Sequence, residues 1–475
     1  MLSYPDLHLA IDGDHIRDGR ETLPVLNPAT GREIARLPIA TEADVARALA
    51  TAERAFRLWS ATPAEERAAV LRRTGALLRE RSAQIAAIAT MEQGKTIAEA
   101  TAEVAMAAAS FEWAAEEARR IYGRMLVRPS GRRSIVTREP VGPIAAFAPW
   151  NFPIDNPARK FSAPLAAGCS VILKPAEESP ASALAVLSAL ADAGLPAGVA
   201  QILFGVPDRI SRQLIASPVI RQVSLTGSVV VGKALMRLAA DGMKRTTFEL
   251  GGHAPVLIFD DADLDRAVTM TATSKYRNAG QVCISPTRFY VQAGVYDRFV
   301  DMFAQRASAM VVGDGADPAT NMGPMANARR LPAMERLIDD AMRHGARLVT
   351  GGVRGNGEGF FWRPTVLADV PRGAAIMNEE PFGPIAAMAR FESFDEAITE
   401  ANRLPYGLAA YAFTQSADRA LALGPALEAG MVGINTTMVA GADSPFGGVK
   451  ESGHGSEEGP EGVESCLITK AIHQG

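Results

Sequence analysis

The sequence predicts an α/β protein with two domains that are each built on a parallel sheet, and three observations carry that prediction. The chain has 475 residues, which is too long for one ordinary hydrophobic core. From Gly142 onward, apolar strand candidates alternate with helix signals, as they do in parallel βαβ units. A second alternating region begins with the apolar run 254–259 and continues to about residue 440, so we expect a second domain of the same class.

The part of the chain before Gly142 begins with strands and continues with helices. Short strands and turns are expected over the first 40 residues, where the segment 27–31 (NPATG) is a strong turn signal. Helix starts are predicted at 41–44 (TEAD), a capping pair, and at 62–65 (TPAE), which combines an N-cap, a first-turn proline and a reciprocal acid. Alanine-rich amphipathic sequence then extends to about Arg120.

The first alternating region has four strand candidates, and they are 144–148, 171–174, 201–204 and 222–225. Helices are expected to start after the second strand, at Ser179 and Pro180, and after the fourth, near Ser228. Two further strand-like segments, 134–137 and 466–469, fit neither domain. Such segments either join subunits or form a local hairpin.

Composition and cysteine usage exclude several classes of protein. The 49 basic and 53 acidic residues give a net charge of −4 and are spread along the chain, so neither nucleic acid nor a membrane is an expected partner. The amino terminus has no signal-peptide features, and no apolar run approaches about 20 residues, which predicts a cytosolic protein. Cys169, Cys283 and Cys466 form no CxxC pair and the six histidines are scattered, so neither a disulfide framework nor a metal site is expected.

The segment 277–284 (RNAGQVCI) holds the candidate nucleophile, Cys283. A cysteine among Gly and Asn residues can lie in a turn with its sulfur accessible, whereas Cys169 lies in an apolar run and is expected in the core. Cys466 is expected to be inert. Because a free thiol has a pKa of about 8.5, a nucleophilic cysteine needs a base or an electrostatic partner to form its thiolate.

Two other segments hold candidate partners for that cysteine. The segment 248–252 (FELGG) places Glu249 among apolar and glycine residues, where the carboxyl pKa would rise toward that of a general base. The segment 150–153 (WNFP) isolates Asn151, whose amide could donate a hydrogen bond to an oxyanion. Taken alone, each residue has a plain alternative, because Glu249 could be a solvated loop residue and Asn151 could form a turn.

Together these three segments resemble the aldehyde dehydrogenase superfamily. The resemblance covers nearly the whole chain, through the segments 27–31 (NPATG), 225–228 (LTGS), 379–384 (EEPFGP) and 445–448 (PFGG). It implies a three-part fold, with an arm of strands that completes a dimer or a tetramer. The implied parts are a nucleotide-binding domain (1–121 and 142–251), a catalytic domain (252–452) and the oligomerisation arm (122–141 and 453–475).

The resemblance also implies a covalent mechanism for oxidising an aldehyde to its carboxylate. Cys283 would attack the aldehyde carbon, and the Asn151 amide and the Cys283 backbone N–H would hold the oxyanion. After hydride transfer to nicotinamide, Glu249 would activate the water that hydrolyses the thioester. Glu457 stands where many relatives have a proton-relay carboxylate, although a solvent-exposed glutamate is the plain alternative.

The implied cofactor cleft does not follow the GxGxxG pattern. The segment 227–232 (GSVVVG) after a strand can still direct helix N–H groups at a pyrophosphate. By the resemblance, Lys174 and Glu177 would bind the adenosine ribose, Glu380 would hold the nicotinamide ribose and Phe382 would pack near the ring. The complete set of implied cofactor-binding residues is Trp150, Lys174, Glu177, Gly227, Ser228, Gly232, Glu380 and Phe382.

A carboxylate at position 177 bears on the choice of cofactor. The 2′-phosphate of NADP would meet the like charge of Glu177, at a cost of roughly 1–4 kcal/mol at about 4 Å. NAD is therefore the predicted cofactor. Lys174 could offset part of the repulsion, which leaves NADP as the less favoured option.

The substrate prediction depends on a narrower resemblance, to succinate-semialdehyde dehydrogenases, in 111–117 (FEWAAEE) and 121–123 (IYG). In that group two arginines bind the distal carboxylate of the substrate, and the matching residues here are Arg159 and Arg277. A planar guanidinium suits a carboxylate because it donates two parallel hydrogen bonds, whereas the alternative is that these arginines bridge helices or face solvent. The implied substrate-binding residues are Arg159, Arg277, Phe152, Ile284 and Phe446.

Two departures from that group keep other substrates open. Ser285 stands where many of its members have a second cysteine, and the tail 450–459 differs from the commoner version. The alternatives are other ω-oxo acids and neutral aliphatic or aromatic aldehydes. A relative that transfers the acyl group to coenzyme A would not need Glu249, and a non-catalytic relative would not need Cys283.

Overall fold

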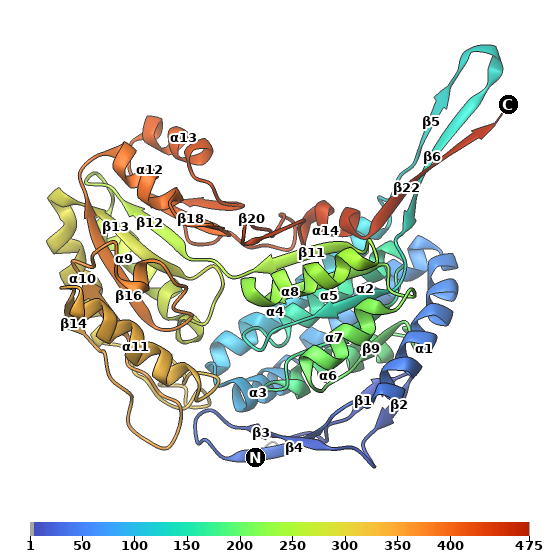
Figure 1. The fold of residues 1–475 in the computed structure, drawn as a ribbon, viewed down its shortest axis with the longest axis horizontal. Coiled ribbons are helices and arrows are strands. Elements are labelled where there is room, and N and C mark those ends of the chain that lie inside the picture. The colour runs from blue at the N-terminus through green and yellow to red at the C-terminus, as the bar shows by residue number, and fades with distance from the viewer. Residues whose placement is uncertain (1–3, 475) are drawn as a thin grey trace.

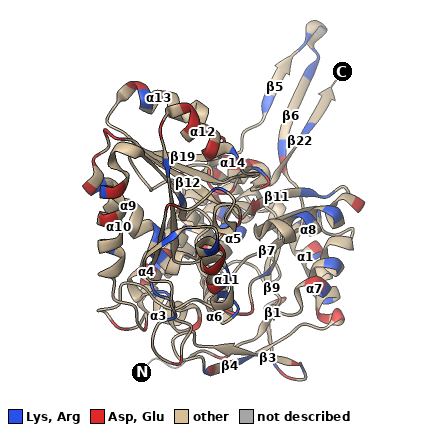
Figure 2. Ribbon diagram, turned by 60° about the vertical axis from the view of Figure 1, so that its left-hand side comes forward, with Lys and Arg blue, Asp and Glu red and all other residues tan. Residues whose placement is uncertain are grey.

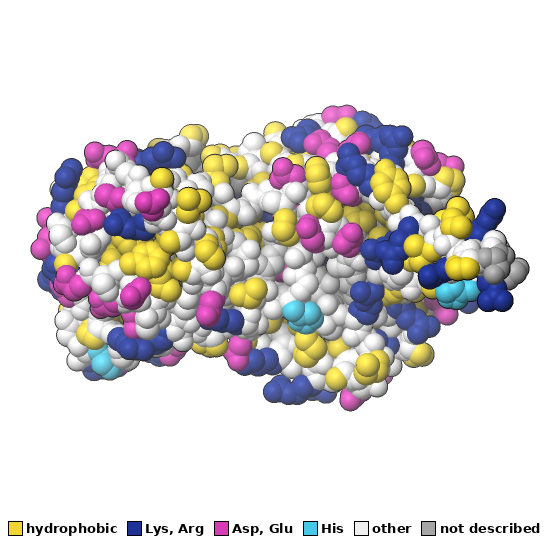
Figure 3. All heavy atoms as spheres, turned by 90° about the horizontal axis from the view of Figure 1, so that it is seen from above, with side chains coloured by type: hydrophobic (Ala, Val, Ile, Leu, Met, Phe, Trp, Pro, Cys, Tyr) yellow, Lys and Arg dark blue, Asp and Glu magenta, His cyan; other side chains and the backbone are white. Residues whose placement is uncertain are grey.

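The computed structural model describes residues 4–474. Two α/β lobes lie side by side, and a narrow arm of three strands projects from the first lobe (Figure 1). Each lobe has its own hydrophobic core, and the second core begins at Ala254. Positive and negative side chains are intermixed over both lobes (Figure 2) and over the face seen from above (Figure 3). The predicted α/β fold with two domains and an additional strand arm is confirmed.

The first lobe contains an eight-stranded sheet. Five adjacent strands of this sheet run parallel, and in spatial order they are β9, β8, β7, β10 and β11. In order across the sheet, the strands are β2 (Asp14–Ile16), β1 (Leu9–Ile11), β9 (Ala200–Ile202), β8 (Val171–Lys174), β7 (Ile144–Phe147), β10 (Gln222–Gly227), β11 (Arg245–Leu250) and β21 (Gly453–His454). The predicted parallel pattern is therefore present. The strand expected at 201–204 ends earlier, at Ile202.

Eight helices surround this sheet in the described chain. They are α1 (Glu42–Ala61), α2 (Ala64–Glu80), α3 (Ser82–Gln93), α4 (Ile97–Ala118), α5 (Asp155–Ala167), α6 (Pro180–Asp192), α7 (Pro207–Ala216) and α8 (Val229–Asp241). The capping box predicted at Thr41 and Asp44 is present. The N-cap predicted at Thr62 is wrong, because α1 extends to Ala61 and the Thr62 hydroxyl donates to the Leu58 carbonyl of that helix at 3.1 Å.

The second lobe contains a seven-stranded sheet, and every strand pair except β14 with β15 is parallel. In order, the strands are β14 (Arg347–Thr350), β15 (Thr365–Ala368), β16 (Ile385–Phe391), β13 (Pro286–Gln292), β12 (Ala254–Ile258), β18 (Ala409–Phe413) and β19 (Met431–Ile434). Its helices are α9 (Leu264–Tyr276), α10 (Tyr296–Ser308), α11 (Arg330–Arg343), α12 (Phe394–Asn402) and α13 (Ala417–Ala426). The second α/β region therefore lies where the sequence predicts it. The exact domain boundaries stay predictions.

The arm joins the two strand-like segments that fit neither domain. Its central strand pairs antiparallel with a neighbour on each side, and the three strands are β5 (Arg124–Val127), β6 (Arg133–Pro140) and β22 (Leu467–Gln474). The short helix α14 (Gly459–Ser465) leads into β22. The segments thus pair within one chain, while the role of the arm in oligomerisation stays a prediction.

Shorter elements complete the fold. They are the hairpin of β3 (Thr22–Leu26) and β4 (Glu33–Pro38), the pair β17 (Tyr406–Gly407) and β20 (Val449–Lys450), and the 3₁₀ segments Pro129–Gly131, Arg277–Gly280, Ala293–Val295 and Ala375–Met377. Cys169 and Cys466 are buried, and all three cysteines are free. Among residues 4–474 no helix has the length and apolar character needed to cross a membrane. Within the same range no cluster of His, Cys, Asp and Glu could hold a metal ion.

Candidate active site

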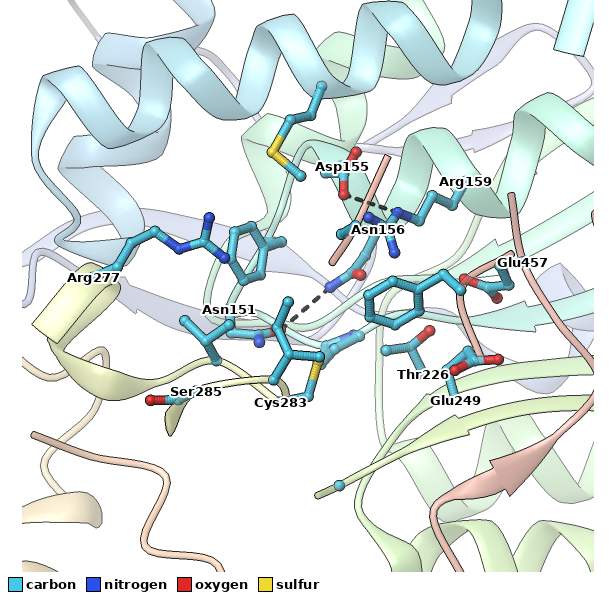
Figure 4. A pocket seen from close by; sticks show the side chains of 18 of the residues that line it. Asn151, Asp155, Asn156, Arg159, Thr226, Glu249, Arg277, Cys283, Ser285 and Glu457 are labelled. Carbon is cyan, nitrogen blue, oxygen red and sulfur yellow. Dashed lines mark hydrogen bonds and ion pairs between the residues drawn. The ribbon is translucent and has the colours of Figure 1, made fainter. Parts of the chain in front are cut away.

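A cavity of about 930 Å³ lies between the two lobes (Figure 4). The segments that follow the parallel strands β7, β10 and β11 line it from one side, because the carboxyl ends of parallel strands meet at one edge of a sheet. The loop between α9 and β13 lines it from the other side. Fourteen predicted site residues line it, namely Trp150, Asn151, Phe152, Arg159, Gly227, Ser228, Glu249, Arg277, Cys283, Ile284, Glu380, Phe382, Phe446 and Glu457. Lys174, Glu177 and Gly232 lie outside its lining.

Cys283 is presented to the cavity by a strained turn. Three consecutive residues before it, Asn278, Ala279 and Gly280, are left-handed, with φ of 50°, 52° and 72°. Non-glycine residues pay about 1–2 kcal/mol for this conformation. At Gly280 a side chain is also sterically excluded, since a Cβ there would lie 2.2 Å from the Gly383 carbonyl oxygen. The turn leaves Cys283 half-buried, unlike the other two cysteines.

The charged groups around Cys283 shift the pKa of its thiol in opposite directions. Burial raises the pKa of its thiol to about 12, and the Glu380 carboxylate contributes to the increase. The guanidinium groups of Arg159 and Arg277 lower that pKa. The thiol is therefore protonated at neutral pH in this arrangement, and forming a thiolate requires a change in the charges around it.

The side chain of Asn151 is held in one orientation beside this turn. Its amide nitrogen donates to the Gln281 carbonyl at 3.1 Å, and its amide oxygen accepts from Asn156 at 3.3 Å. The backbone carbonyl of Asn151 accepts from Lys95 at 2.9 Å and from Asn278 at 2.8 Å. An N–H donor is thus positioned at the cavity wall near Cys283, as an oxyanion site requires.

The sequence analysis missed the buried ion pair that supports the Asn151 loop. Lys95 and Glu103 are paired, with both side chains 1% exposed. The Glu103 carboxylate also accepts the backbone N–H groups of Ile154, at 2.7 Å, and Asp155, at 3.1 Å, at the start of α5. No local pattern distinguishes Glu103 from the other acidic residues of α4, because its partners come from a distant part of the chain.

Glu249 is the second-last residue of β11 and is 2% exposed, so it is not the solvated loop residue of the plain alternative. Neither of its carboxylate oxygens has a hydrogen-bond partner in the described chain. Burial raises its pKa well above the ordinary value, the nearby Glu457 adds to this, and Lys160 opposes it. A carboxyl group with a raised pKa is a stronger base than an ordinary carboxylate, as a general base requires.

Glu457 is 7% exposed, so its interpretation as a solvent-exposed glutamate is wrong. The chain from Phe446 to Glu457 folds back on itself, with mutual backbone hydrogen bonds at 2.7 and 2.9 Å. This places the Glu457 carboxylate in an ion pair with Lys160 and 3.3 Å from the Ser224 hydroxyl. Lys160 and Ser224, which the sequence analysis also missed, connect Glu457 to α5 and β10.

The two arginines that were predicted to bind the distal carboxylate of the substrate differ in their contacts. The guanidinium of Arg159 is paired with Asp155 at 2.9 Å and with Glu458 at 3.2 Å, as the helix-bridging alternative expects. The Arg277 guanidinium lies 5.3 Å from the Phe152 ring centre and makes no hydrogen bond or ion pair with any described residue. Of the two predicted anion-binding side chains, Arg277 alone is unpaired.

Ser285 connects the Cys283 loop to a buried lysine. The ammonium of Lys275 donates to the Ser285 hydroxyl at 3.2 Å, and the lysine side chain is inaccessible to solvent. Burial lowers the pKa of Lys275 to about 7. The Ser285 hydroxyl therefore has a structural partner.

The first turn of α8 begins at the cavity wall. Ser228 caps this helix, its hydroxyl accepting from the Val231 N–H at 3.3 Å, and its neighbour Gly227 lines the cavity. Gly232 packs against β11, where a Cβ would lie 2.5 Å from Leu250. The Thr226 hydroxyl is buried at the cavity wall without a partner among the described residues. A free helix N-terminus beside an unsatisfied hydroxyl suits an anionic ligand.

Lys174 and Glu177 lie at the end of β8 and form an ion pair at 2.6 Å. Glu177 also accepts the Gly205 N–H at 3.1 Å. The carboxylate is therefore held in place, and Lys174 already neutralises part of its charge.

Glu380 and Phe382 form the other side of this region. The Phe382 ring meets the Trp150 ring edge to face, with centres 5.5 Å apart. Glu380 accepts the Gly252 N–H at 3.3 Å, and burial raises its pKa to about 8. Arg330, which the sequence analysis missed, lines the cavity and lowers the Glu380 pKa, and its buried Nε has no partner in the described chain.

Comparison with known proteins shows similarity over nearly the whole chain. The sequence profile of the aldehyde dehydrogenase family matches residues 15–472. A 4-(hydroxymethyl)benzenesulfonate dehydrogenase of Comamonas testosteroni is 50% identical, covering 97% of each chain. A 3-sulfolactaldehyde dehydrogenase of Pseudomonas putida is 44% identical, covering 96% of this chain and 94% of the relative. The NADP(+) succinate-semialdehyde dehydrogenase of Escherichia coli is 42% identical, covering 95% and 94%.

Solved structures of related enzymes are similar to the fold of this chain. An NADP-dependent enzyme of E. coli superimposes with a TM-score of 0.97 at 41% identity, covering 99% of this chain and 98% of its own. A betaine aldehyde dehydrogenase of Staphylococcus aureus in complex with NAD+ superimposes with a TM-score of 0.96 at 32% identity, covering 99% and 94%. The predicted dependence on a nicotinamide dinucleotide is confirmed by these relatives. The chain therefore belongs to the aldehyde dehydrogenase family and is an oxidoreductase that acts on aldehydes.

Proposed function

We propose that this enzyme uses NAD to oxidise an aldehyde that carries an acid group remote from the reacting carbon, through a thioester on Cys283. The observation that supports it best is the cavity itself, which contains a half-buried thiol, a fixed amide donor, a buried carboxyl group and one unpaired guanidinium. These are the groups that covalent aldehyde oxidation requires.

In the first step, the Cys283 thiol loses its proton to solvent, the thiolate sulfur attacks the aldehyde carbon, and the carbonyl oxygen becomes an oxyanion. The Asn151 amide and the Cys283 backbone N–H stabilise this oxyanion, and losing one such donor typically costs about 10²–10³ in rate. The chemistry that a bound dinucleotide would supply is a hydride acceptor, by which the thiohemiacetal on Cys283 would be oxidised to a thioester. The helix N-terminus at Ser228 and the side chains of Glu380 and Phe382 would hold the dinucleotide.

In the second step, the thioester is hydrolysed. Glu249 takes a proton from water, the hydroxide attacks the thioester carbon, and the carbon–sulfur bond breaks. The carboxylic acid that forms gives its proton to the departing thiolate, which leaves the carboxylate and restores the Cys283 thiol. The proton on Glu249 can pass to the Glu457 and Lys160 pair, whose charges already act on the Glu249 pKa. The buried position of this pair supports the relay role of Glu457.

We expect NAD to be preferred over NADP because the Glu177 carboxylate is fixed where the adenosine ribose would bind. In Glu177→Ser, the ratio of kcat/KM for NADP to that for NAD should rise about tenfold, since a like charge is removed and Lys174 is freed. Steady-state kinetics with both cofactors measure this ratio. Glu178→Ser is the matched control, and an equal change in that variant would contradict the role of Glu177.

The substrate proposal combines the unpaired Arg277 with the names of the relatives. Those names describe a benzenesulfonate, a sulfolactaldehyde and a succinate semialdehyde. A sulfonate or carboxylate remote from the reacting carbon is common to all three. Arg277 can donate two parallel hydrogen bonds to either group, and the Phe152 ring beside it suits the apolar part of a substrate.

A panel of aldehydes tests the substrate class. Succinate semialdehyde and 4-formylbenzenesulfonate would be compared with butanal and benzaldehyde, and NADH formation would be followed at equal pH and salt. We expect at least one acidic aldehyde to exceed its neutral counterpart in kcat/KM by tenfold or more, which is about 1.4 kcal/mol of transition-state binding. A preference for the neutral members would leave an aldehyde dehydrogenase of a different substrate class.

Replacing Arg277 should affect acidic aldehydes selectively. In Arg277→Gln, we expect kcat/KM for the preferred acidic aldehyde to fall about 10- to 100-fold, because a charged hydrogen bond contributes about 1.5–3 kcal/mol. Kinetics with a neutral aldehyde of the same length provide the reference. Arg298→Gln on the exposed face of α10 is the control, and an equal loss with acidic and neutral aldehydes would reject the proposed anion site.

We also propose that the arm mediates assembly of a homodimer or a homotetramer. Tyr122 and Val127, at the base and edge of the arm, are 73% and 78% exposed. Large apolar side chains on a projecting strand edge are typical of a surface that another chain covers.

A further inference from the structure

The wall of the cavity formed by α5 carries a buried cluster of three charged side chains. Arg159 lies between Asp155 and Glu458, and all three side chains are between 3% and 6% exposed. The Glu458 carboxylate also accepts the Ser110 hydroxyl at 2.9 Å. All three charged residues line the cavity that contains Cys283, and Figure 4 shows Asp155 and Arg159 together on the side opposite Arg277.

Local structure holds this cluster together. Asp155 is four residues before Arg159 in α5, so the two side chains share one face of the helix. Glu458 is a left-handed residue, with φ of 58°, directly before α14, and its side chain reaches back to α5. The Arg159 guanidinium also lies 4.4 Å from the Phe446 ring centre. The arginine is therefore confined by two carboxylates and an aromatic ring.

The charges of the cluster do not cancel. Two carboxylates face one guanidinium, and the buried Oδ1 of Asp155 has no hydrogen-bond partner among the described residues. Across the cavity, the guanidinium of Arg277 has no counter-charge in the described chain. The cavity is thus positive at the end beside α9 and neutral to negative at the wall formed by α5. An anionic group of a ligand is attracted at the first end and repelled at the second.

We infer that Asp155 and Glu458 are specificity-determining residues, which neutralise Arg159 so that Arg277 alone binds the acid group of the substrate. This inference rests on the proposed function, since it concerns which residue holds that acid group. A short semialdehyde whose acid group approaches the α5 wall meets two carboxylates there. Aldehydes whose acid group reaches Arg277 avoid this repulsion.

Isosteric neutral variants test the inference. Asp155→Asn, Glu458→Gln and the double variant would be compared with the unmodified enzyme, using succinate semialdehyde and butanal, which both have four carbons. We expect the ratio of kcat/KM for the acid to that for butanal to rise about tenfold or more in the double variant. Adding Arg159→Met to the double variant should reduce the rise, because the released guanidinium is then absent and only the removal of the two negative charges remains. A ratio that does not rise overturns the inference.

A pH series keeps the test decisive if the double variant does not fold. Burial raises the pKa of Asp155 to about 7, and the charged groups that act on it are Arg159, Glu458, Glu103 and Glu457. The acid-to-butanal ratio should fall as the pH rises through about 7, since Asp155 then gains its charge, and Asp155→Asn should weaken this dependence. An unchanged pH profile in Asp155→Asn overturns the inference.

The proposed function can fail separately from this inference. If Arg277→Gln lowers the acid-to-butanal ratio while the neutral variants leave it unchanged, the acid-binding function stands and the role of the α5 wall is rejected. If Arg277→Gln leaves the ratio unchanged, the anion site of the proposed function is rejected, whatever the neutral variants show.

Discussion

Replacing Cys283 with alanine should lower aldehyde-dependent NADH formation by at least about 10³-fold, because no other group at the cavity can form the thioester. The two remaining cysteines are buried away from the cavity lining. Loss of the thiol also removes the covalent bond that holds the aldehyde carbon, so a large excess of substrate should not restore the rate. Steady-state kinetics with the preferred aldehyde measure the effect.

The control for this variant is Cys169→Ala, which removes a thiol from the core beneath α5. Its activity should stay close to that of the unmodified enzyme, with a decrease in thermal stability. Binding of NAD to Cys283→Ala, measured by quenching of tryptophan fluorescence, should persist because Ser228, Glu380 and Phe382, which we propose hold the dinucleotide, are unchanged in this variant. Normal turnover by Cys283→Ala would reject the covalent mechanism.

Glu249→Gln should separate the two chemical steps. The first step does not need the carboxylate, so we expect a burst of NADH close to one per active site. The following turnover should fall about 10²–10⁴-fold, the usual contribution of a general base. Rapid-mixing kinetics would measure the burst, and mass spectrometry should find an acyl group on Cys283.

The pH dependence of turnover provides a second readout of Glu249. Burial raises its pKa, and only the deprotonated carboxylate can accept a proton from water, so hydrolysis of the thioester should accelerate as the pH rises through that elevated value. Glu249→Gln should lose this acceleration. The control is Glu464→Gln, an exposed residue of α14. An unchanged hydrolysis rate in the variant at 249 would place the base elsewhere, and the absence of a burst would show that Glu249 also acts in the first step.

Local patterns predicted the parts of the fold that depend on neighbouring residues. The capping box at Thr41 and the strand at 171–174 are present as expected, because side-chain capping and apolar runs are properties of contiguous sequence. The cap at Thr62 failed for a related reason. Its residues fit a helix start, but the preceding helix continues up to them, and a local pattern does not specify where a preceding helix ends.

The residues of the candidate site also fall into two groups, those that a local pattern predicts and those that only the folded chain shows. The segments holding Cys283, Glu249 and Asn151 are recognisable because each contains several characteristic residues in a row. The charged partners of the site are single residues from distant segments, such as Glu103 under the Asn151 loop and Glu458 against Arg159. Their sequences resemble ordinary helix surface, so only the folded chain shows that they are buried and paired.

The contact between Gly280 and Gly383 limits how this enzyme can be redesigned. A side chain at Gly280 is excluded, since a Cβ there would meet the Gly383 carbonyl. A Cβ at Gly383 would lie 2.3 Å from the Met334 sulfur, so the Met334 side chain would have to move. One glycine belongs to the nucleophile loop and the other to the segment that carries Glu380 and Phe382. A mutant library that aims to change the cofactor side of the cavity will therefore also displace the nucleophile unless both glycines are kept, and productive changes should be concentrated in the wall formed by α5.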